Sequence, residues 1–388
     1  MRRLAYPRRS RGKRGGARDT DARVRVQIVD PSAFTPPYDR ALCAALVRAG
    51  AQVELVTSRF AYGAVTLAAG YDVRESFYRW APGTPGSRVR LAAKLAQHVP
   101  DMLALRRRAA AADLLHFQWL SVQAADVHLL PRSRPVVLTA HDVLPREPRR
   151  GQLDAQRRLY ERVDAVVVHS EHGRARLRDE LRVDPAKLHV ISHGAFSHLT
   201  RVPDERPLPP ELAAVEKPVV LLFGLMRPYK GIEVALEAWR GTEEAELWIV
   251  GRPRMDIAPL RAVAPPGVRW VPRFVADAEM GAYFRRADLV VLPYRQIDQS
   301  GVLFTALAFG KPLLLGAVGG FPEVAATGAA ELVPPGDAAA LHAAFVRLLA
   351  DSSARARLAA AARAAAAGPY AWDAIARRTL SLYTELTS

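Results

Sequence analysis

Short apolar runs alternate along this chain with longer segments of helical periodicity. The pattern is clearest in residues 287–335, where it predicts an apolar strand at Leu289 to Leu292 and a buried helix at Val302 to Phe309. A second strand is predicted at Pro312 to Leu315. Strand, loop, helix and strand form one parallel crossover unit. Open α/β sheets of such units bind their ligands at the carboxyl ends of the strands.

The loop of this unit carries Gln299, Ser300 and Gly301 directly before the helix. Small residues at a helix start leave backbone N–H groups free near the positive end of the helix dipole, which suits a phosphate. The same residue types also serve as ordinary caps and turns. We predict a diphosphate site near Ser300 and Gly301, with a plain connection as the alternative.

The strand–helix–strand pattern also opens the chain. It predicts a strand from Val24 to Val29, a helix ended by Gly50 and a strand from Val53 to Ser58. The first loop carries Pro36-Pro37-Tyr38-Asp39 where a dinucleotide-binding fold has G-x-G-x-x-G. The missing fingerprint argues against a nicotinamide or flavin dehydrogenase.

Residues 60–110 mix aromatic and charged residues, which could line an acceptor site or cover the sheet. A helix is predicted from about Arg88 to Ala112, because apolar residues recur at every fourth position. They are Leu91, Leu95, Val99 and Leu103.

His141 and Asp142 stand just beyond a strand predicted at Val136 to Thr139. An imidazole at a strand end can bind a sugar hydroxyl or move a proton, although many such histidines only pack. A further strand is predicted at the start of 165–181, before a helix, and a final strand at Leu188 to Gly194. The histidine pairs there, His169 with His172 and His189 with His193, have spacings that a metal could use. No cysteine or carboxylate completes a ligand set, so no metal site is predicted.

A segment rich in proline and charge, residues 201–217, precedes a restart of the pattern with a strand at Val219 to Gly224. Arg227 and Lys230 follow this strand, on the same rim of the predicted sheet as Ser300. They would neutralise a diphosphate and stabilise the charge growing on a leaving group, the alternative being a solvated basic turn. Two Rossmann-like halves in succession predict a cleft between two domains.

Length and composition agree with two cores. The chain has 388 residues, a length that exceeds what one core usually supports. Half of the residues are hydrophobic, which argues against disorder. A single cysteine, Cys43, excludes an internal disulfide and favours a reducing cytosol. The first 23 residues lack the apolar segment of a secretory signal. The longest apolar run, 301–321, is interrupted at Lys311 and Pro312, so no membrane span is predicted.

The net charge is +16, and residues 1–23 contribute nine basic against two acidic side chains. We expect this segment to be a disordered basic tail that contacts nucleic acid or anionic lipid, or is simply solvated. Basic clusters in the body, at 106–108 and 146–158, suit an anionic substrate or a membrane surface.

Several motifs together resemble one family. FGLMRPYKG, DLVVLPY, QSGVLFTALAFGKP, VGGFPEV and ELVPPGD occur in this order, and LTAHDVLP, VDAVVVHSE and VISHG precede them. The set resembles the retaining glycosyltransferases of family 4, which have the GT-B fold, and it covers nearly everything after Arg23. The resemblance implies an α/β GT-B protein with two Rossmann-like domains facing an interdomain cleft.

The resemblance also implies an activity. A sugar would pass from a nucleotide-diphosphate donor, held mainly by the second domain, to a glycan or lipid-linked acceptor held mainly by the first. The anomeric configuration would be retained, and no metal or cofactor would be required beyond the nucleotide sugar as co-substrate. The implied domains are an acceptor domain at 24–200, a linker at 201–217 and a donor domain at 218–368. The final segment, 369–388, is expected to pack back toward the first domain.

The resemblance assigns roles residue by residue. Lys230 and Arg227 would bind the diphosphate, and His141 would contact the donor sugar. Further donor contacts fall on Gly224, Asp298, Gln299, Ser300, Gly301 and Thr305, and on the pair Arg273-Phe274 beside the base.

The chain departs from the family pattern at two points. The family has two glutamates whose positions here are Ile297 and Thr305. Asp298 would replace the first by a shift of the loop, while Thr305 offers only a hydroxyl. Pro36-Pro37 also replaces the usual glycines of the first loop. These changes leave the nucleotide contacts and the sugar open.

Two other functions remain open from the sequence. One is a non-catalytic protein of the same fold that binds a sugar nucleotide or a polyanion, and the other is a nucleotide-sugar epimerase. The expected location is the cytoplasm, with peripheral contact at the inner face of an anionic membrane, and nucleic acid is not an expected partner.

Overall fold

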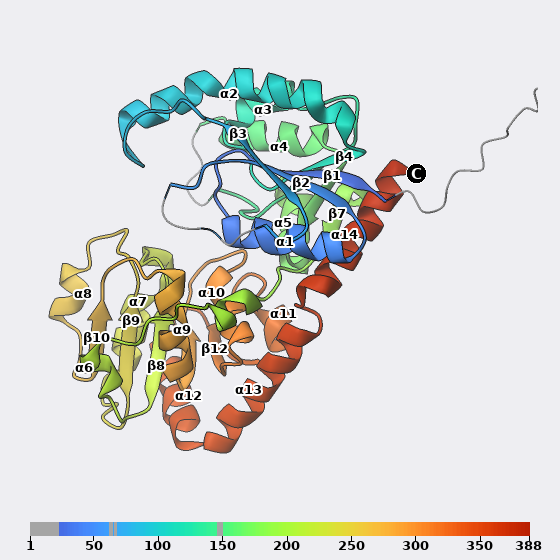
Figure 1. Ribbon diagram of the computed structural model, residues 1–388. Helices are drawn as coiled ribbons and strands as arrows, with labels where there is room; N and C mark the ends of the chain where they lie inside the picture. Colours follow the sequence, from blue (N-terminus) through green and yellow to red (C-terminus); the bar gives the residue numbers. More distant parts are fainter. Residues whose placement is uncertain (1–22, 62–64, 66–67, 146–149) are drawn as a thin grey trace, which may run out of the picture.

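The computed structural model describes residues 23–61, 65, 68–145 and 150–388. The chain folds into two α/β domains, each built on one parallel sheet, as predicted (Figure 1). The predicted basic tail lies almost wholly outside the described residues. Within the described ranges, no helix combines the length and the apolar composition needed to cross a bilayer.

The first sheet has seven parallel strands in the order β3-β2-β1-β4-β5-β6-β7. Its central strands are buried at every position, because helices cover both faces of the sheet, and this explains their continuous apolar runs. The strands are β1 Arg25–Asp30, β2 Gln52–Ser58, β3 Asp72–Phe77, β4 Leu114–Phe117, β5 Val136–Thr139, β6 Ala165–Val168 and β7 Leu188–Val190.

Strand β3 was not predicted. It pairs with β2 at the edge of the sheet, and most of its side chains are polar and exposed or half-buried. An edge strand of this kind carries no apolar run by which a sequence reveals it.

Five α-helices complete the first domain. Side-chain oxygens cap two of them, since Ser87 accepts from the N–H of Arg90 and Ser170 accepts from the N–H of Gly173. The helices are α1 Pro36–Arg48, α2 Arg88–Arg108, α3 Gln123–Leu129, α4 Gln152–Arg162 and α5 Glu171–Glu180.

The predicted helix α2 forms, but its periodic apolar residues do not face the core. Leu91, Leu95, Val99 and Leu103 are 60%, 52%, 44% and 37% exposed. The face that packs on the domain carries His98, Met102 and Leu105 instead. Figure 1 shows α2 at the outer edge of the domain, with α3 and α4 on its inner side.

The second sheet has six parallel strands in the order β10-β9-β8-β11-β12-β13. Its helices again cover both faces, and two hydrophobic clusters fill the space on either side. The strands are β8 Val219–Phe223, β9 Glu246–Val250, β10 Val268–Val271, β11 Leu289–Leu292, β12 Leu313–Gly316 and β13 Ala330–Val333.

The helices of the second half continue to the end of the chain. The short helix α6 and a 3-10 turn lie in or beside the proline-rich connection between the domains. The helices are α6 Pro210–Ala213, α7 Ile232–Ala238, α8 Ala258–Ala262, α9 Asp277–Arg286, α10 Gly301–Ala308, α11 Phe321–Ala325, α12 Ala338–Ala350, α13 Ser352–Ala367 and α14 Trp372–Thr387.

The last helix, α14, crosses back to the first domain and lies against α1 (Figure 1). Its first residue, Trp372, sits so close to Gly194 that a Cβ added there would lie 2.4 Å from the indole ring. Farther along, Tyr383 Oη is 2.5 Å from His116 Nδ1 on β4. The carboxyl-terminal helix therefore ties the second half of the chain to the core of the first domain.

Candidate functional site

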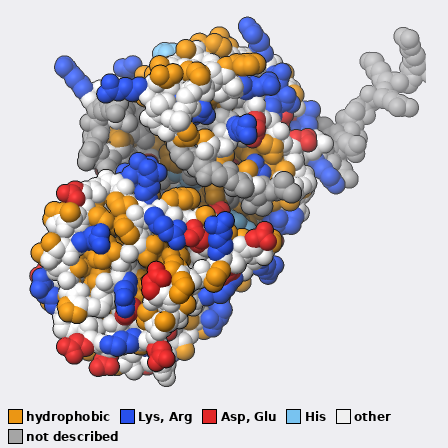
Figure 2. All heavy atoms as spheres, turned by 60° about the vertical axis from the view of Figure 1, so that its left-hand side comes forward, with side chains coloured by type: hydrophobic (Ala, Val, Ile, Leu, Met, Phe, Trp, Pro, Cys, Tyr) orange, Lys and Arg blue, Asp and Glu red, His pale blue; other side chains and the backbone are white. Residues whose placement is uncertain are grey.

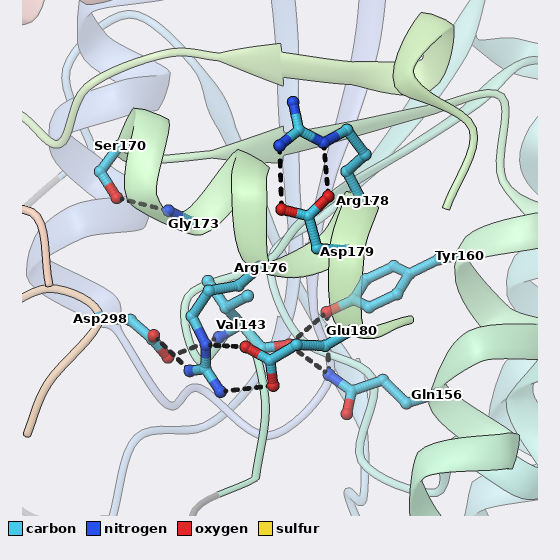
Figure 3. Close-up of polar contacts among 10 residues, drawn as sticks. All are labelled: Val143, Gln156, Tyr160, Ser170, Gly173, Arg176, Arg178, Asp179, Glu180 and Asp298. Carbon is cyan, nitrogen blue, oxygen red and sulfur yellow. Dashed lines mark hydrogen bonds and ion pairs between the residues drawn. The ribbon is translucent and has the colours of Figure 1, made fainter. Parts of the chain in front are cut away.

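The carboxyl ends of the two sheets face each other, and side chains join them directly. Asp298, in the loop after β11, accepts from Arg176 Nη1 on α5 at 2.8 Å. Its second oxygen accepts from the N–H of Val143, after β5, at 3.1 Å (Figure 3). Glu323 Oε1 accepts from the N–H of His172 at 3.2 Å, which adds a second link.

Packing contacts continue this interface. The His193 ring stacks on Phe304 of α10 with centroids 4.4 Å apart and an interplanar angle of 13°. A Cβ added to Gly320 would meet Ser170 Cβ at 2.9 Å and Gln299 Nε2 at 2.6 Å, so the two domains approach closely there. Figure 2 shows the two lobes with an indentation between them.

Lys230 lies at the predicted diphosphate site, in the second domain. Its side chain is 5% exposed, and its Nζ donates to the carbonyl of Phe223 at 3.3 Å and lies 4.9 Å from the Tyr294 ring centroid. A Cβ added to Gly224 would lie 2.9 Å from Lys230 Nζ and 3.0 Å from Val302 Cγ2. The ammonium group is therefore beside the first turn of α10.

Two features of the structure require glycine at position 224. Its φ is +101°, a conformation that side chains rarely adopt, and the space above its Cα is taken by the lysine. The glycine lets the lysine ammonium approach the strand end. A larger residue would displace it.

Ser300 and Gly301 form the start of α10, as the diphosphate prediction requires. Ser300 is buried and occupies the N-cap position without capping the helix by its side chain. The first turn holds no acidic residue, and N–H groups of a first helical turn have no partners within the helix. An anion placed there would meet these donors, the helix dipole and Lys230 together.

The other predicted donor residues are placed differently. The Thr305 hydroxyl donates to the carbonyl of Gly301 at 2.9 Å, inside its own helix. Arg227 is exposed at the rim. Arg273 pairs with Glu279 at 2.7 Å, and the adjacent Phe274 is 58% exposed, free to stack on a planar ring. No contact here tests the roles given to these side chains, which stay predictions.

Asp298 was predicted to take the place of a donor-binding glutamate. In this structure its two oxygens serve Arg176 and Val143 of the first domain. A donor contact by Asp298 would therefore compete with the bonds that hold the two domains together.

In the first domain, His141, His169 and His193 cluster at the carboxyl ends of the strands and form what we call the histidine wall. Tyr38 lies at their centre, with ring centroids 4.7 Å from His141, 5.5 Å from His169, 4.9 Å from His193 and 5.0 Å from Trp372. Each histidine follows a different strand, so the parallel sheet brings them together. The cluster gives the first domain a buried aromatic wall next to α10.

A chain of hydrogen bonds sets the tautomer of His141. His169 Nδ1 is 2.9 Å from the carbonyl of Ile191, which can only accept, so this nitrogen carries a proton. In the neutral ring, His169 Nε2 accepts from His141 Nδ1 at 3.3 Å. The lone pair of His141 is then on Nε2, which lies 3.1 Å from Gln118 Oε1, while Gln118 Nε2 is buried without a partner. Exchanging the two amide atoms of Gln118 resolves both, because the amide nitrogen then donates to His141 Nε2.

Burial keeps these rings neutral. It lowers the pKa of His116 to about 3, with a smaller contribution from His169. It likewise lowers the pKa of His193 to about 3 and the pKa of His169 to about 4. Burial and the neighbouring histidines also lower the pKa of His141 well below its usual value. At neutral pH, His141 is therefore a neutral ring whose Nδ1 donates to His169 and whose Nε2 can accept a hydrogen bond.

A cavity of about 670 Å³ opens beside His141. Trp119 stacks on His141 with centroids 5.0 Å apart and forms part of the wall. The remaining lining includes residues at the ends of β4 and β5, at the start of α3 and in or just before α4, among them Gln118, Arg150 and Tyr160. The cavity lies in the first domain, where the acceptor was expected.

Among the residues that the structure describes, no group of three or more His, Cys, Asp or Glu side chains is placed to hold a metal ion. The histidine cluster illustrates why. Its members bond to one another, to backbone carbonyls and to Gln118.

The sequence reasoning missed His169, His193 and Trp119 as parts of this wall. A usable signal was present, because Trp119 and His169 follow predicted strands as His141 does, and His193 lies near the end of the strand predicted at Leu188 to Gly194. Applying the strand-end rule to every strand would have found them.

Two parallel α/β domains that face each other with their strand ends define the GT-B class of glycosyltransferase fold. Residues 217–351 match the family described as glycosyl transferases group 1, and residues 40–195 match glycosyltransferase family 4. The chain belongs to this glycosyltransferase family, as its motifs indicated.

The individual relatives share only part of their length with this chain. A GDP-mannose:glycolipid 4-beta-D-mannosyltransferase of Xanthomonas campestris is 27% identical over 52% of this chain, which spans only 60% of that relative. A phosphatidyl-myo-inositol mannosyltransferase of Mycobacterium leprae is 35% identical over 45% of this chain and 49% of its own length.

Solved structures show the fold more completely. Sucrose-phosphate synthase from Thermosynechococcus elongatus superposes with a TM-score of 0.75, over 94% of this chain and 99% of that one. Its sequence identity is 22%, so this likeness supports the architecture alone.

The bond between Arg176 and Asp298 gives a first testable expectation. The two side chains are 22% and 10% exposed, so Arg176→Met leaves a poorly solvated carboxylate held only by the N–H of Val143. We expect a loss of about 1–3 kcal/mol in the free energy of unfolding, measured by urea titration.

Arg178→Met is the matched control on the same helix. Arg178 pairs with Asp179, but both side chains are more than half exposed (Figure 3). Exposed pairs contribute about 0–1 kcal/mol. An equal loss for the two variants would show that the interdomain bond adds nothing to stability.

Proposed function

We propose that this protein transfers a sugar from a nucleotide-diphosphate sugar, bound by the second domain, to a lipid-linked acceptor bound by the first. The observation that supports it best is the buried Lys230 ammonium beside the start of α10, the helix whose Phe304 stacks on His193 of the first domain. A buried cation next to the N–H group of Gly301, at the positive end of the helix dipole, suits a diphosphate.

Each group then has a task in the transfer. As the bond between sugar and phosphate breaks, negative charge grows on the leaving nucleoside diphosphate. Lys230, Arg227 and the N–H groups at Ser300 and Gly301 stabilise that charge, which lowers the barrier. A hydroxyl of the donor sugar takes the place of the Gln118 amide as hydrogen-bond donor to His141 Nε2, which fixes the orientation of the sugar. No resident cofactor is part of this proposal.

The acceptor is proposed to be a glycolipid presented at an anionic membrane, from the cytoplasmic side. The Xanthomonas and Mycobacterium relatives carry glycolipid and phosphatidyl-inositol acceptors in their names. On this chain, the exposed apolar face of α2 lies beside basic side chains, which suits contact with such a surface.

The test is release of nucleoside diphosphate from a panel of GDP-, UDP- and ADP-sugars, with and without a short-chain glycolipid acceptor. We expect turnover with one nucleotide class, dependent on the acceptor and with retained anomeric configuration in the product by NMR. Folded protein that neither binds nor turns over any donor would contradict the proposal. Isomerisation of the donor sugar without acceptor would identify an epimerase instead.

A further inference from the structure

A second cavity, of about 330 Å³, lies between α2 and the loop after β1 in the first domain. Its wall combines three cationic side chains with apolar and aromatic ones, and none of the described residues that line it carries a carboxylate. The cations are Arg59, Arg90 and Lys94.

The cations are held at the cavity in different ways. Arg90 Nη1 donates to the carbonyls of Ala81 at 2.8 Å and Gly83 at 3.4 Å, which fixes the guanidinium. Lys94 Nζ lies 4.8 Å from the Tyr78 ring centroid. Burial, and secondarily the charge of Arg90, lowers the pKa of Lys94, while the more distant Asp30 opposes this. A bound anion would relieve the repulsion between the two cations.

The amino end of α2 contributes to the same wall. Gly86 and Ser87 line the cavity and lead into a helix of 21 residues whose first turn carries no acidic side chain. The helix dipole therefore adds to the positive potential of the side chains. The combination is suited to one or two phosphate groups.

One wall of the cavity continues onto the protein surface. Leu91 and Leu95 line the cavity and begin the exposed apolar face of α2, which Val99 and Leu103 extend. Beside it, Trp80 is 80% exposed and donates its backbone N–H to Gln97 of α2 at 2.9 Å. Figure 2 shows hydrophobic side chains gathered on the upper lobe with basic ones around them. An apolar tail leaving the cavity would lie along this face.

The opposite side of the cavity leads toward the histidine wall. Phe34, Ser121 and Val122 line both this cavity and the larger one that contains His141 and Trp119. A molecule with its phosphate at the cations would thus extend its head group toward His141.

From this arrangement we propose that the smaller cavity binds the phosphate or diphosphate of a phosphorylated lipid acceptor, whose tail covers the exposed face of α2. The inference rests on the proposed transferase function, because it names the acceptor of the same reaction. The occupant is a lipid rather than a free phosphate, since the cationic cavity and the apolar face share Leu91 and Leu95.

Isothermal titration calorimetry with three probes tests the site directly: farnesyl diphosphate, inorganic diphosphate and farnesol. We expect farnesyl diphosphate to bind at least tenfold more tightly than either other probe. The double variant Arg59→Gln/Lys94→Gln should weaken this binding at least tenfold. The control Arg88→Gln, an exposed cation on the first turn of α2 outside the cavity, should change it less than twofold.

A second pair of variants separates the tail from the phosphate. Leu91→Gln/Leu95→Gln should weaken farnesyl diphosphate at least fivefold and leave inorganic diphosphate unchanged, while Val346→Gln on α12 changes neither. Folding of each variant is checked by its thermal midpoint. Binding that survives loss of both cations, equal weakening by Arg88→Gln, or equal affinity for farnesyl and inorganic diphosphate would overturn the proposal.

The same titrations distinguish this proposal from the transferase itself. Nucleoside diphosphate is expected to bind the Arg59→Gln/Lys94→Gln variant as tightly as the unchanged protein. Farnesyl diphosphate binding that depends on the two cations would support the cavity even if no donor bound. Donor turnover with a glycolipid and no binding of farnesyl diphosphate would reject the cavity and keep the transferase.

Discussion

Replacing Lys230 with alanine is expected to lower kcat/KM for the nucleotide sugar by about 10²–10³-fold, the range for loss of a donor that stabilises a developing anion. The ammonium lies beside Gly224 and the first turn of α10, where it would contact the diphosphate as charge grows. The same change should remove most of the thermal stabilisation that added nucleoside diphosphate gives, because that stabilisation depends on ligand concentration over affinity.

Lys217→Ala provides the control in the same domain. Lys217 precedes β8, so it lies at the amino ends of the strands, away from the carboxyl ends that carry Lys230. Its Nζ donates to the carbonyl of Glu243. Its removal should leave turnover within about twofold, since the site is untouched. Similar losses for Lys217→Ala and Lys230→Ala, in folded proteins, would show that Lys230 does not serve the diphosphate.

Stability should fall as the pH is lowered from 6 to 5. His116, His169 and His193 are buried and have pKa values of about 3 to 4 in the folded state, below the ordinary value of 6.5. Through this window the unfolded chain takes up protons that the folded chain does not. Each histidine therefore costs about 1.2 kcal/mol between pH 6 and pH 5.

A buried aspartate opposes this trend. Burial and the adjacent Asp30 raise the pKa of Asp39, so protonation of this carboxyl favours the folded state as the pH falls. This offsets part of the loss that the histidines cause. We expect a net loss of stability from pH 6 to pH 5, measured by urea unfolding at each pH.

His116→Gln tests the origin of the effect, because it removes one of the buried neutral rings. The pH dependence of unfolding should weaken by about one proton, whatever the stability of the variant itself. An unchanged slope, or a stability that stays constant from pH 6 to pH 5 in the natural chain, would contradict the assignment of buried neutral histidines.

The fold could largely be predicted because its central strands are apolar throughout. Strands such as Val136–Thr139 and Leu289–Leu292 are covered by helices on both faces, so nearly every residue in them is apolar and the run is visible in the sequence. Strand β3, at an edge, has no such constraint and was missed. The apolar stripe of α2 was detected as a helix, but its period cannot say whether the stripe meets a core or the surroundings.

The site could be predicted in part for a related reason. Lys230, Ser300 and His141 could be proposed as site residues because each follows a strand. In a parallel sheet, the residues that follow the strands lie together at the carboxyl ends. The bond between Asp298 and Arg176 joins residues 122 positions apart in different domains, so it could not be predicted from a local sequence pattern. The tautomer of His141 likewise depends on His169 and the carbonyl of Ile191.

The most direct measurement is a crystal structure of the protein with a bound nucleoside diphosphate. The account predicts phosphate oxygens within hydrogen-bonding distance of Lys230 Nζ and of the N–H of Gly301. A diphosphate bound elsewhere, with no phosphate oxygen within hydrogen-bonding distance of Lys230 Nζ, would contradict it.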